Sequence, residues 1–354
     1  MKRQAAVGFI IVIVIGAGMI LWRRSMVPSD GGEQRYVAHT QSIMATPVTV
    51  IAPEPVAAEV AALVFDVFRD IDVTMSEWKP DSPLTAVNRA AGADAVAVPE
   101  DLRAVIRRGI ELGDLTGGAF DITWAALWGV WDFKADPPAL PDPGEIERRL
   151  ALIDYSEVEI DDDAGTVRLP RAGMFIGLGG IAKGTALNRA VEALEARGFD
   201  SFLISSGGQV VVRGRRGERP WRVGIRDPRG GIDDHFADLD VMDTGVSTSG
   251  DYERFFILDG ERYHHILDPR TGRPSRELRS ATVVCADAEL ADALSTAMMI
   301  VGPAEARALA DRMDGVEIVL VDEHGAVHVS DGLQAALLMR HEPVERIDPT
   351  TVDD

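Results

Sequence analysis

Apolar residues recur at helical spacing in two stretches of the first third of the chain. Between residues 55 and 75 one face is apolar, through Val60, Leu63, Val64, Val67, Phe68 and Ile71. This spacing predicts an amphipathic helix with one buried face. A second helix is predicted at about 99–115, because Pro99 followed by Glu100 and Asp101 is typical of a helix N-terminus.

The second half of the chain has short apolar runs broken by glycine. The proline-rich segment "KADPPALPDP" at 134–143 predicts an irregular loop, and the runs "VEIDDDAGTVRL", "SFLISSGGQVVVRG" and "WRVGIRD" follow it. Helices are predicted at about 182–197 and 289–301, the latter followed by a helical "AEARALADRM" and two or three short strands. The three glycine-broken runs are hairpin signals rather than strand–helix alternation. They favour an α+β domain with a largely antiparallel sheet over a doubly wound parallel one.

Composition narrows the classes of function. A chain of 354 residues that is 46% hydrophobic can bury a large core. Its formal net charge of −21, with no Lys/Arg-rich run, excludes nucleic acid as an expected partner. The single cysteine, Cys285, lies in the apolar run "ATVVCA", which predicts a buried thiol rather than a nucleophile or a metal ligand.

The N-terminus carries an apolar stretch, Ala5 to Trp22, with basic residues on both sides. It is just long enough to cross a hydrocarbon core of about 30 Å. We therefore predict a signal anchor or signal peptide at 1–24 and a polar linker at 25–41. No clear cleavage site precedes the linker, so an uncleaved anchor is favoured, with the domain on the extracytoplasmic side.

The segment "GLGGIAKG" has the features of an anion site. Gly177, Gly179 and Gly180 lead into a predicted helix that carries Lys183 in its first turn. Glycines let the backbone approach a ligand, and a helix N-terminus presents unpaired N–H groups. Only four lysines occur in the chain, against 32 arginines, so this one is notable. The spacing is neither that of a Walker motif nor that of a dinucleotide-binding fingerprint.

A second constellation is "ELADALSTAMMIVG", where Asp292 and Thr296 lie four positions apart on a predicted helix. Both oxygens then project from one face, one turn apart. Carboxylate and hydroxyl oxygens are ligands suited to Mg²⁺, which usually completes its shell with substrate phosphates and water. The alternative is a polar helix face on which the threonine bonds to the preceding turn.

Aromatic residues crowd the segment "TGGAFDITWAALWGVWDF". The helical spacing of Trp124, Trp128 and Trp131 predicts that these rings pack in the core. Asp121 lies among apolar residues and must find hydrogen-bond partners. Such a wall suits an aromatic ring system with hydrogen-bonding edges.

The segment "HHILDPRTG" lies between the strand-like runs "ERFFIL" and "SATVVCA". In an extended segment His264 and His265 point to opposite faces, so one of them is expected to be a bystander. Two roles are open for Asp268 and Arg270, namely ordering the loop or holding phosphate, but together with Pro269 they are most simply read as a turn.

Taken in order, seven segments closely resemble the ApbE family of flavin transferases. They are "SEWKPDSPLTAVN", "GGAFDITWAALWGVW", "GLGGIAKG", "SSGGQVVVRG", "STSGDYERFF", "HHILDPRTGRP" and "ADALSTA", and they span about Met44 to Gly302. The resemblance implies a T-fold-related flavin transferase domain, at 42–340, followed by an acidic tail at 341–354.

The activity implied by the resemblance is that of an exported, Mg²⁺-dependent enzyme. Such an enzyme splits FAD, releases AMP and attaches FMN through its phosphate to a Thr or Ser hydroxyl. The acceptors that the family implies are flavoprotein subunits of membrane electron-transfer complexes. Alternatives are an FAD pyrophosphatase, in which water replaces the hydroxyl, and a flavin-binding accessory protein without turnover.

The resemblance also assigns residues to FAD. Met44 and Trp78 would lie at the isoalloxazine, where the family often has tyrosine at the second position. Ala119, Phe120 and Asp121 would line FAD.

The remaining assignments concern the phosphates. Lys183 would meet the flavin nucleotide, while Asp292, Thr296 and the backbone carbonyl of Gly180 would hold Mg²⁺. His265 would be the base or a phosphate contact. Attack of a hydroxyl on phosphorus needs charge neutralisation and a proton acceptor, which makes Asp292 and His265 the candidate catalytic residues.

One position departs from the family pattern. The family has an aspartate that contacts FAD at the start of this glycine-rich motif, whereas this chain has Gly177. Loss of that acceptor is expected to weaken FAD binding by about 1 to 3 kcal/mol, about tenfold or more.

Overall fold

A computed structural model describes residues 34–344, which lie in one compact unit beginning at Gln34. The predicted membrane segment at 1–24 and part of the predicted linker lie outside the described residues. Within 34–344, no helix has the length and apolar character needed to span a bilayer.

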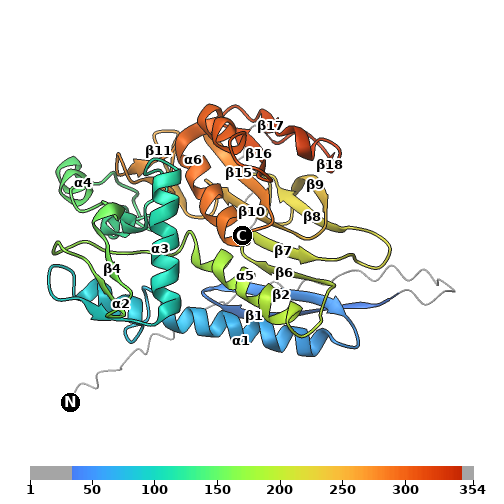
Figure 1. Cartoon of the computed structure of the whole chain (residues 1–354). Coiled ribbons are helices and arrows are strands. Elements are labelled where there is room, and N and C mark those ends of the chain that lie inside the picture. The colour runs from blue at the N-terminus through green and yellow to red at the C-terminus, as the bar shows by residue number, and fades with distance from the viewer. Residues whose placement is uncertain (1–33, 345–354) are drawn as a thin grey trace, which may run out of the picture. The chain divides into compact units, whose positions relative to one another are not determined.

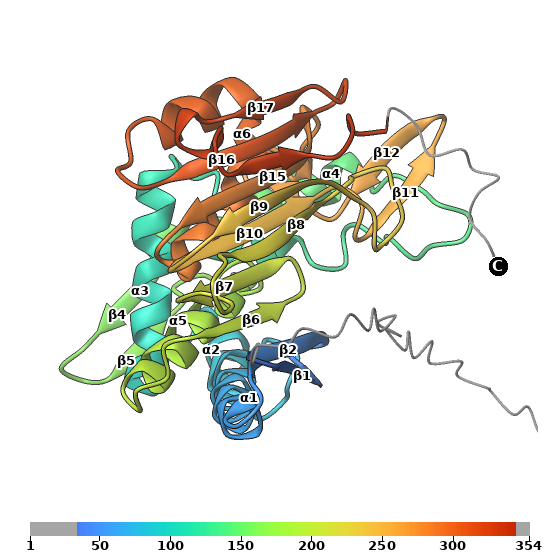
Figure 2. The same ribbon diagram turned by 90° about the vertical axis from the view of Figure 1, so that its right-hand side faces the viewer.

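An antiparallel sheet of eight strands forms the centre of the domain, and Figures 1 and 2 show it from two sides. Its strands are, in spatial order, β1 (Tyr36–Ile43), β2 (Thr46–Pro53), β6 (Phe202–Ser206), β7 (Gln209–Arg213), β10 (Thr244–Gly250), β15 (Leu278–Cys285), β16 (Glu317–Asp322) and β17 (Val327–Val329). Every neighbouring pair is antiparallel. The predicted α+β class with a largely antiparallel sheet and flanking helices is confirmed.

Both faces of the main sheet are covered. Helices α1 (Ala57–Met75), α5 (Ala182–Glu195) and α6 (Ala288–Ala310) lie on one face. A small sheet of β8 (Trp221–Arg226), β9 (His235–Val241) and β18 (Leu337–Met339) covers part of the other, where its apolar side chains join those of the main sheet in one cluster. Because β15 lies between the two layers, every residue along it is buried, including Cys285.

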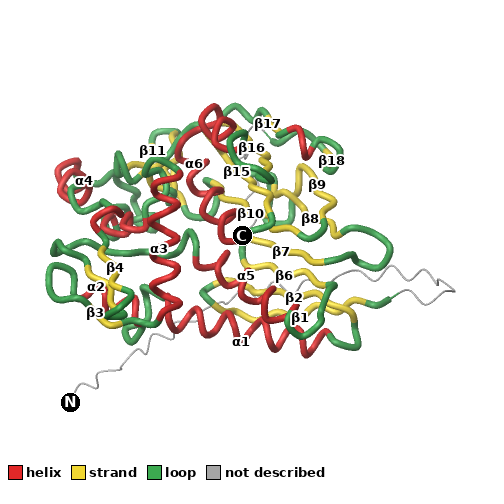
Figure 3. Tube along the Cα trace, viewed as in Figure 1, coloured by secondary structure: helices red, strands yellow, loops and turns green. Residues whose placement is uncertain are grey.

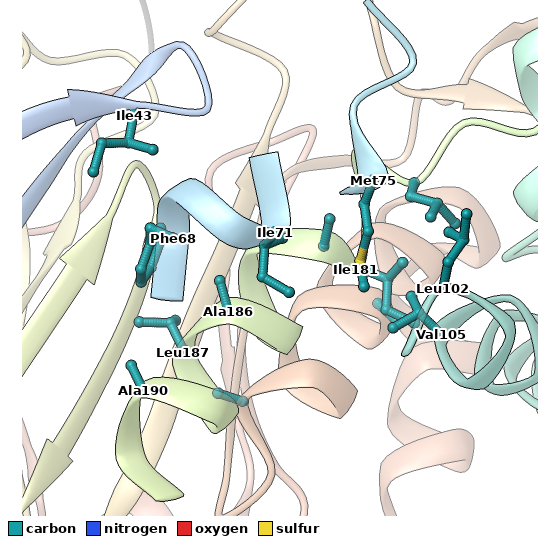
Figure 4. Packing of buried hydrophobic residues seen from close by; sticks show 14 of the residues in the cluster. Ile43, Phe68, Ile71, Met75, Leu102, Val105, Ile181, Ala186, Leu187 and Ala190 are labelled. Atoms are coloured by element: carbon teal, nitrogen blue, oxygen red, sulfur yellow. The ribbon is translucent and has the colours of Figure 1, made fainter. Parts of the chain in front are cut away.

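The helix predicted at 55–75 is α1, and its apolar spacing has the expected consequence. Phe68 and Ile71 are buried, and Figure 4 shows Phe68 beside Leu187 and Ile71 beside Ala186 of α5. Helix α6 continues past the predicted end, with a break at Gly302, whose φ of 81° lies in the left-handed region that glycine favours.

Smaller elements surround this core, and Figure 3 distinguishes them from the loops that connect them. They are α2 (Pro83–Arg89), β3 (Val96–Ala97), α3 (Glu100–Leu115), the 3₁₀ helix η1 (Ile122–Leu127), α4 (Pro143–Leu150), η2 (Tyr155–Glu157), β4 (Glu159–Asp161), β5 (Thr166–Arg168), β11 (Phe255–Leu258), β12 (Glu261–His264), β13 (Leu267–Asp268), β14 (Arg273–Pro274) and η3 (Asp331–Leu333). An apolar cluster that includes Leu127, Trp131, Phe256 and Tyr263 joins η1 to the β11–β12 hairpin. It fixes the position of the histidine segment that ends β12.

Two predicted boundaries need correction. The linker at 25–41 overlaps β1, which begins at Tyr36 and pairs along its whole length with β2. Only the last side chain of this edge strand, that of Ile43, is buried, so its composition resembles that of a linker. The tail predicted to begin at 341 is bonded to the domain through Val344, whose N–H donates to Asp227 and whose carbonyl accepts from Arg279.

Candidate active site

The N-terminal turns of α5 and α6 approach closely beside β10. A Cβ atom on Gly184 would lie 2.5 Å from the carbonyl oxygen of Ala288, so only glycine permits this contact. The Gly184 N–H donates to Oδ2 of Asp292 at 3.0 Å. Lys183 Nζ lies 4.0 Å from the same oxygen and donates to the Gly179 carbonyl at 2.9 Å. The two predicted motifs therefore form one site.

Asp292 is almost fully buried, with 1% of its surface exposed. Burial raises the pKa of its carboxyl, while Lys183, the Gly184 N–H and the Gln209 side chain act in the opposite direction. A carboxylate in such surroundings is stabilised by a nearby cation.

Neutral oxygens accompany this carboxylate. Thr296 Oγ1 lies 3.4 Å from Ser249 Oγ, and a Cβ atom on Gly180 would lie 3.6 Å from that Oγ1. Oε1 of Gln209 is buried without a hydrogen-bond partner. The alternative bond from Thr296 to the Asp292 carbonyl is also present, at 3.5 Å.

These donors suit a hard cation. Within residues 34–344 no group of three His, Cys, Asp or Glu side chains could hold a metal ion. One carboxylate with hydroxyl, amide and carbonyl oxygens fits an ion such as Mg²⁺, which takes several ligands from phosphates and water.

The two histidines have different surroundings. His264 is buried at the end of β12, and its Nε2 lies 2.7 Å from the carbonyl oxygen of Ser275. His265 is half-buried, and its backbone N–H donates to the Arg254 carbonyl. Its ring atom Nδ1 is buried without a hydrogen-bond partner. Burial, with the positive charges of His264, Arg254 and Lys183, lowers the pKa of His265 to about 4. Its imidazole is therefore neutral at neutral pH.

The turn predicted after the histidines is present. Asp268 Oδ1 accepts hydrogen bonds from the backbone N–H and the guanidinium of Arg270, at 2.8 and 2.9 Å. These two side chains satisfy each other within the loop.

The tryptophans differ from their prediction. The segment forms the 3₁₀ helix η1, which ends at Leu127, so only Trp131 is buried in the core. Trp124 and Trp128 are half-buried, and Trp128 stacks on Trp78 with centroids 4.1 Å apart at 17°. Trp78 is 71% exposed. The helical spacing gave the wrong result because a 3₁₀ turn and a loop distribute the rings differently from an α-helix.

The "GAFD" residues directly precede η1 and contact the glycine-rich segment. Ala119 and Phe120 are buried, and the Phe120 ring lies 3.2 Å from the Cβ position of Gly180. Asp121 has the partners that its burial requires, because one of its oxygens accepts from both the N–H and the hydroxyl of Thr123. Its contact with FAD stays a prediction.

Met44 lies in the tight turn between β1 and β2. Met44 and Ala45 have φ of 53° and 57°, a left-handed conformation that is unfavourable for both residue types. The turn lies near the β6–β7 turn, since Thr46 Oγ1 is 3.1 Å from Ser206 Oγ. Strained turns of this kind cluster at functional sites.

A model of the ApbE family matches residues 44–320. The chain belongs to the ApbE family. An FAD:protein FMN transferase of Treponema pallidum is 32% identical over 348 residues, which cover 92% of this chain and 93% of that protein. One from Klebsiella pneumoniae is 32% identical over 260 residues, covering 72% and 74% of the two chains.

Solved structures of ApbE proteins have the same fold. An ApbE protein of Thermotoga maritima, 33% identical, aligns with a TM-score of 0.78 over 85% of this chain and 99% of its own. The flavin transferase ApbE of Vibrio cholerae, 25% identical, aligns with a TM-score of 0.74 over 86% and 99%.

The structure adds three residues that our sequence predictions missed. Gln209 and Ser249 lie at the cation donors, and Glu77 lies beside the glycine-rich segment. All three lie inside segments on which the resemblance to the ApbE family rested, namely "SEWKPDS", "SSGGQ" and "STSGD". Their position within those motifs was the only available signal.

Proposed function

We propose that this chain transfers FMN from FAD to a Thr or Ser hydroxyl of an acceptor flavoprotein, with Mg²⁺ as cofactor and AMP as product. The observation that carries the proposal is the buried Asp292 with Lys183 beside it and oxygen donors one turn away. Family membership supports the same activity, since the relatives named above are FAD:protein FMN transferases.

In the proposed reaction the acceptor hydroxyl oxygen bonds to the phosphorus of the FMN half. The bond from that phosphorus to the bridging oxygen breaks, and AMP leaves with that oxygen. Mg²⁺, when bound, neutralises the pyrophosphate oxygens. Lys183 adds a positive charge beside Asp292. His265, which is neutral at neutral pH, accepts the proton from the hydroxyl.

The proposed acceptor is a flavoprotein subunit of a membrane electron-transfer complex. The apolar stretch from Ala5 to Trp22 supports a site of action at the membrane, with the domain in the periplasm. The net charge of −21 continues to argue against nucleic acid.

Acceptor dependence of AMP release tests the proposal. The full chain is incubated with FAD and Mg²⁺, with and without a threonine-bearing flavoprotein subunit, and AMP is quantified. We expect release only with the acceptor, and none from Asp292→Ala. Asp311→Ala, at the exposed C-terminal end of α6, is a control expected to match wild type.

The remaining outcomes separate the alternatives. AMP release that is equal with and without a competent acceptor would identify an FAD pyrophosphatase. Binding of FAD without AMP release would identify an accessory flavin-binding protein.

A further inference from the structure

Glu77 brings a second carboxylate to the site from a segment distant in sequence. It follows the C-terminus of α1 and immediately precedes Trp78. Its Oε1 lies 3.7 Å from the Cβ position of Gly179, so the carboxylate lies against the glycine-rich segment that leads to Lys183. No residue in the described range places a basic nitrogen within 4.0 Å of this carboxylate.

The surroundings satisfy this carboxylate only in part. Burial raises the pKa of Glu77, and its own backbone N–H, the backbone N–H of Leu178 and the charge of Lys183 oppose that shift. A carboxylate has about four lone-pair positions for hydrogen bonds, so acceptor capacity remains for a ligand. The charge of Lys183 acts on Glu77, and Trp78 is the next residue in the chain. An ammonium group suits phosphate, and an indole suits a ring system.

Position 177 cannot provide a carboxylate in this fold. A Cβ atom on Gly177 would lie 2.8 Å from the Cβ of Ala125 and 3.3 Å from Nε1 of Trp124. The Gly177 N–H also donates to the Ile122 carbonyl at 2.8 Å, which fixes the two segments to each other. Ala125 and Trp124 therefore fill the space that a side chain at 177 would need.

We infer that Glu77 is a substrate-binding residue of this chain, whose carboxylate accepts a hydrogen bond from an N–H or O–H group of the nucleoside portions of FAD. The inference rests on the proposed function for the identity of the ligand. It assigns to Glu77 the acceptor role that Gly177 lacks, so a carboxylate enters the site from the end of α1 instead of from the glycine-rich segment.

Calorimetric titration with two ligands tests this role. Wild type, Glu77→Gln and the control Glu195→Gln, at the far end of α5, are titrated with FAD and with inorganic pyrophosphate, both with Mg²⁺. A charge-assisted hydrogen bond predicts that Glu77→Gln raises the Kd for FAD by about ten- to hundredfold. The Kd for pyrophosphate should not rise, because pyrophosphate has no nucleoside. Glu195→Gln should match wild type for both ligands.

Two results would overturn the inference. One is an unchanged Kd for FAD in Glu77→Gln. The other is an equal rise for FAD and pyrophosphate, which would mean that Glu77 acts only by positioning Lys183. Failure of the proposed transfer is distinguishable, because it appears in the acceptor-dependent release of AMP by the wild-type protein and leaves the comparison of FAD affinities intact. A wild-type protein that binds no FAD would overturn both the inference and the proposed function. Thermal unfolding of each variant confirms that the folded state is compared.

Discussion

The Cβ position of Gly177 lies 2.8 Å from the Cβ of Ala125, closer than two such atoms can pack. The glycine at this position is therefore a packing requirement of this chain. The half-buried indole of Trp124 and the methyl group of Ala125 occupy the volume that a side chain at position 177 would need.

This contact predicts coupled effects of substitutions at the two positions. Gly177→Ala should lower the free energy of unfolding by about 1 to 3 kcal/mol, because it overpacks a rigid site. Ala125→Gly removes the opposing methyl group, so the double variant should lose less than the sum of the two single variants. Urea unfolding of all four proteins measures the coupling. Strictly additive losses would mean that the contact does not constrain position 177.

Trp78 is expected to contribute to FAD binding through its ring. It is 71% exposed, and it stacks on Trp128 at 4.1 Å. Trp78→Ala should weaken FAD binding by about three- to tenfold, because an aromatic stack contributes about 0.5 to 1.5 kcal/mol. Trp78→Tyr should retain most of the affinity. Flavin fluorescence titration measures both, with Leu338→Ala on the opposite sheet as a control for loss of an exposed apolar side chain. Equal affinity of Trp78→Ala and wild type would remove this ring from the site.

Local sequence patterns predicted the features that lie within a single helix. The apolar face of α1 and the pair Asp292 and Thr296 are of this kind, because their spacing alone places them together. The strand β1 was missed because an edge strand needs few buried side chains. Glu77 was missed because its partners, Leu178 and Lys183, lie about a hundred positions away, and no local period encodes that contact. The sequence showed Gly177 only as a missing acceptor. That glycine is required at this position follows from the close contact with Ala125, which no local pattern encodes.

Asp292 should reduce stability when no cation is bound. Burial raises the pKa of its carboxyl in the folded state above the unfolded value. Below the unfolded pKa the carboxyl is protonated in both states and the folded protein keeps its full stability. As pH rises through the folded pKa that stability is lost, because the buried group must then ionise. Asp292→Asn should therefore unfold at a higher temperature than wild type at neutral pH without Mg²⁺, and the difference should shrink in acid.

Ligand addition provides the complementary measurement on the same variant. Mg²⁺ with pyrophosphate should raise the Tm of wild type, because a ligand that binds only the folded state stabilises it. The Tm of Asp292→Asn should not respond. An equal shift in both proteins would place the cation elsewhere.

The pKa of His265 determines what we expect on the acid side of the pH profile of kcat/KM. Its pKa of about 4 means that the imidazole of the free enzyme stays neutral until the solution is distinctly acidic. The value of kcat/KM for FAD should therefore show no loss through this group between about pH 8 and about pH 5, since kcat/KM reports groups of the free enzyme. His265→Ala should lower kcat by about 10²- to 10⁴-fold. A descending limb near pH 6.5 that disappears in His265→Ala would contradict the position given to this side chain.

The mass of the acceptor protein after reaction tests the transfer of FMN most directly. A flavoprotein subunit with one candidate threonine is incubated with the full chain, FAD and Mg²⁺, and its intact mass is then measured under denaturing conditions. Transfer predicts an increase equal to FMN less one water, with one AMP formed for each modified acceptor, and no increase when that threonine is replaced by alanine. An acceptor of unchanged mass, with FAD either intact or split to free FMN and AMP, would contradict the proposed transfer.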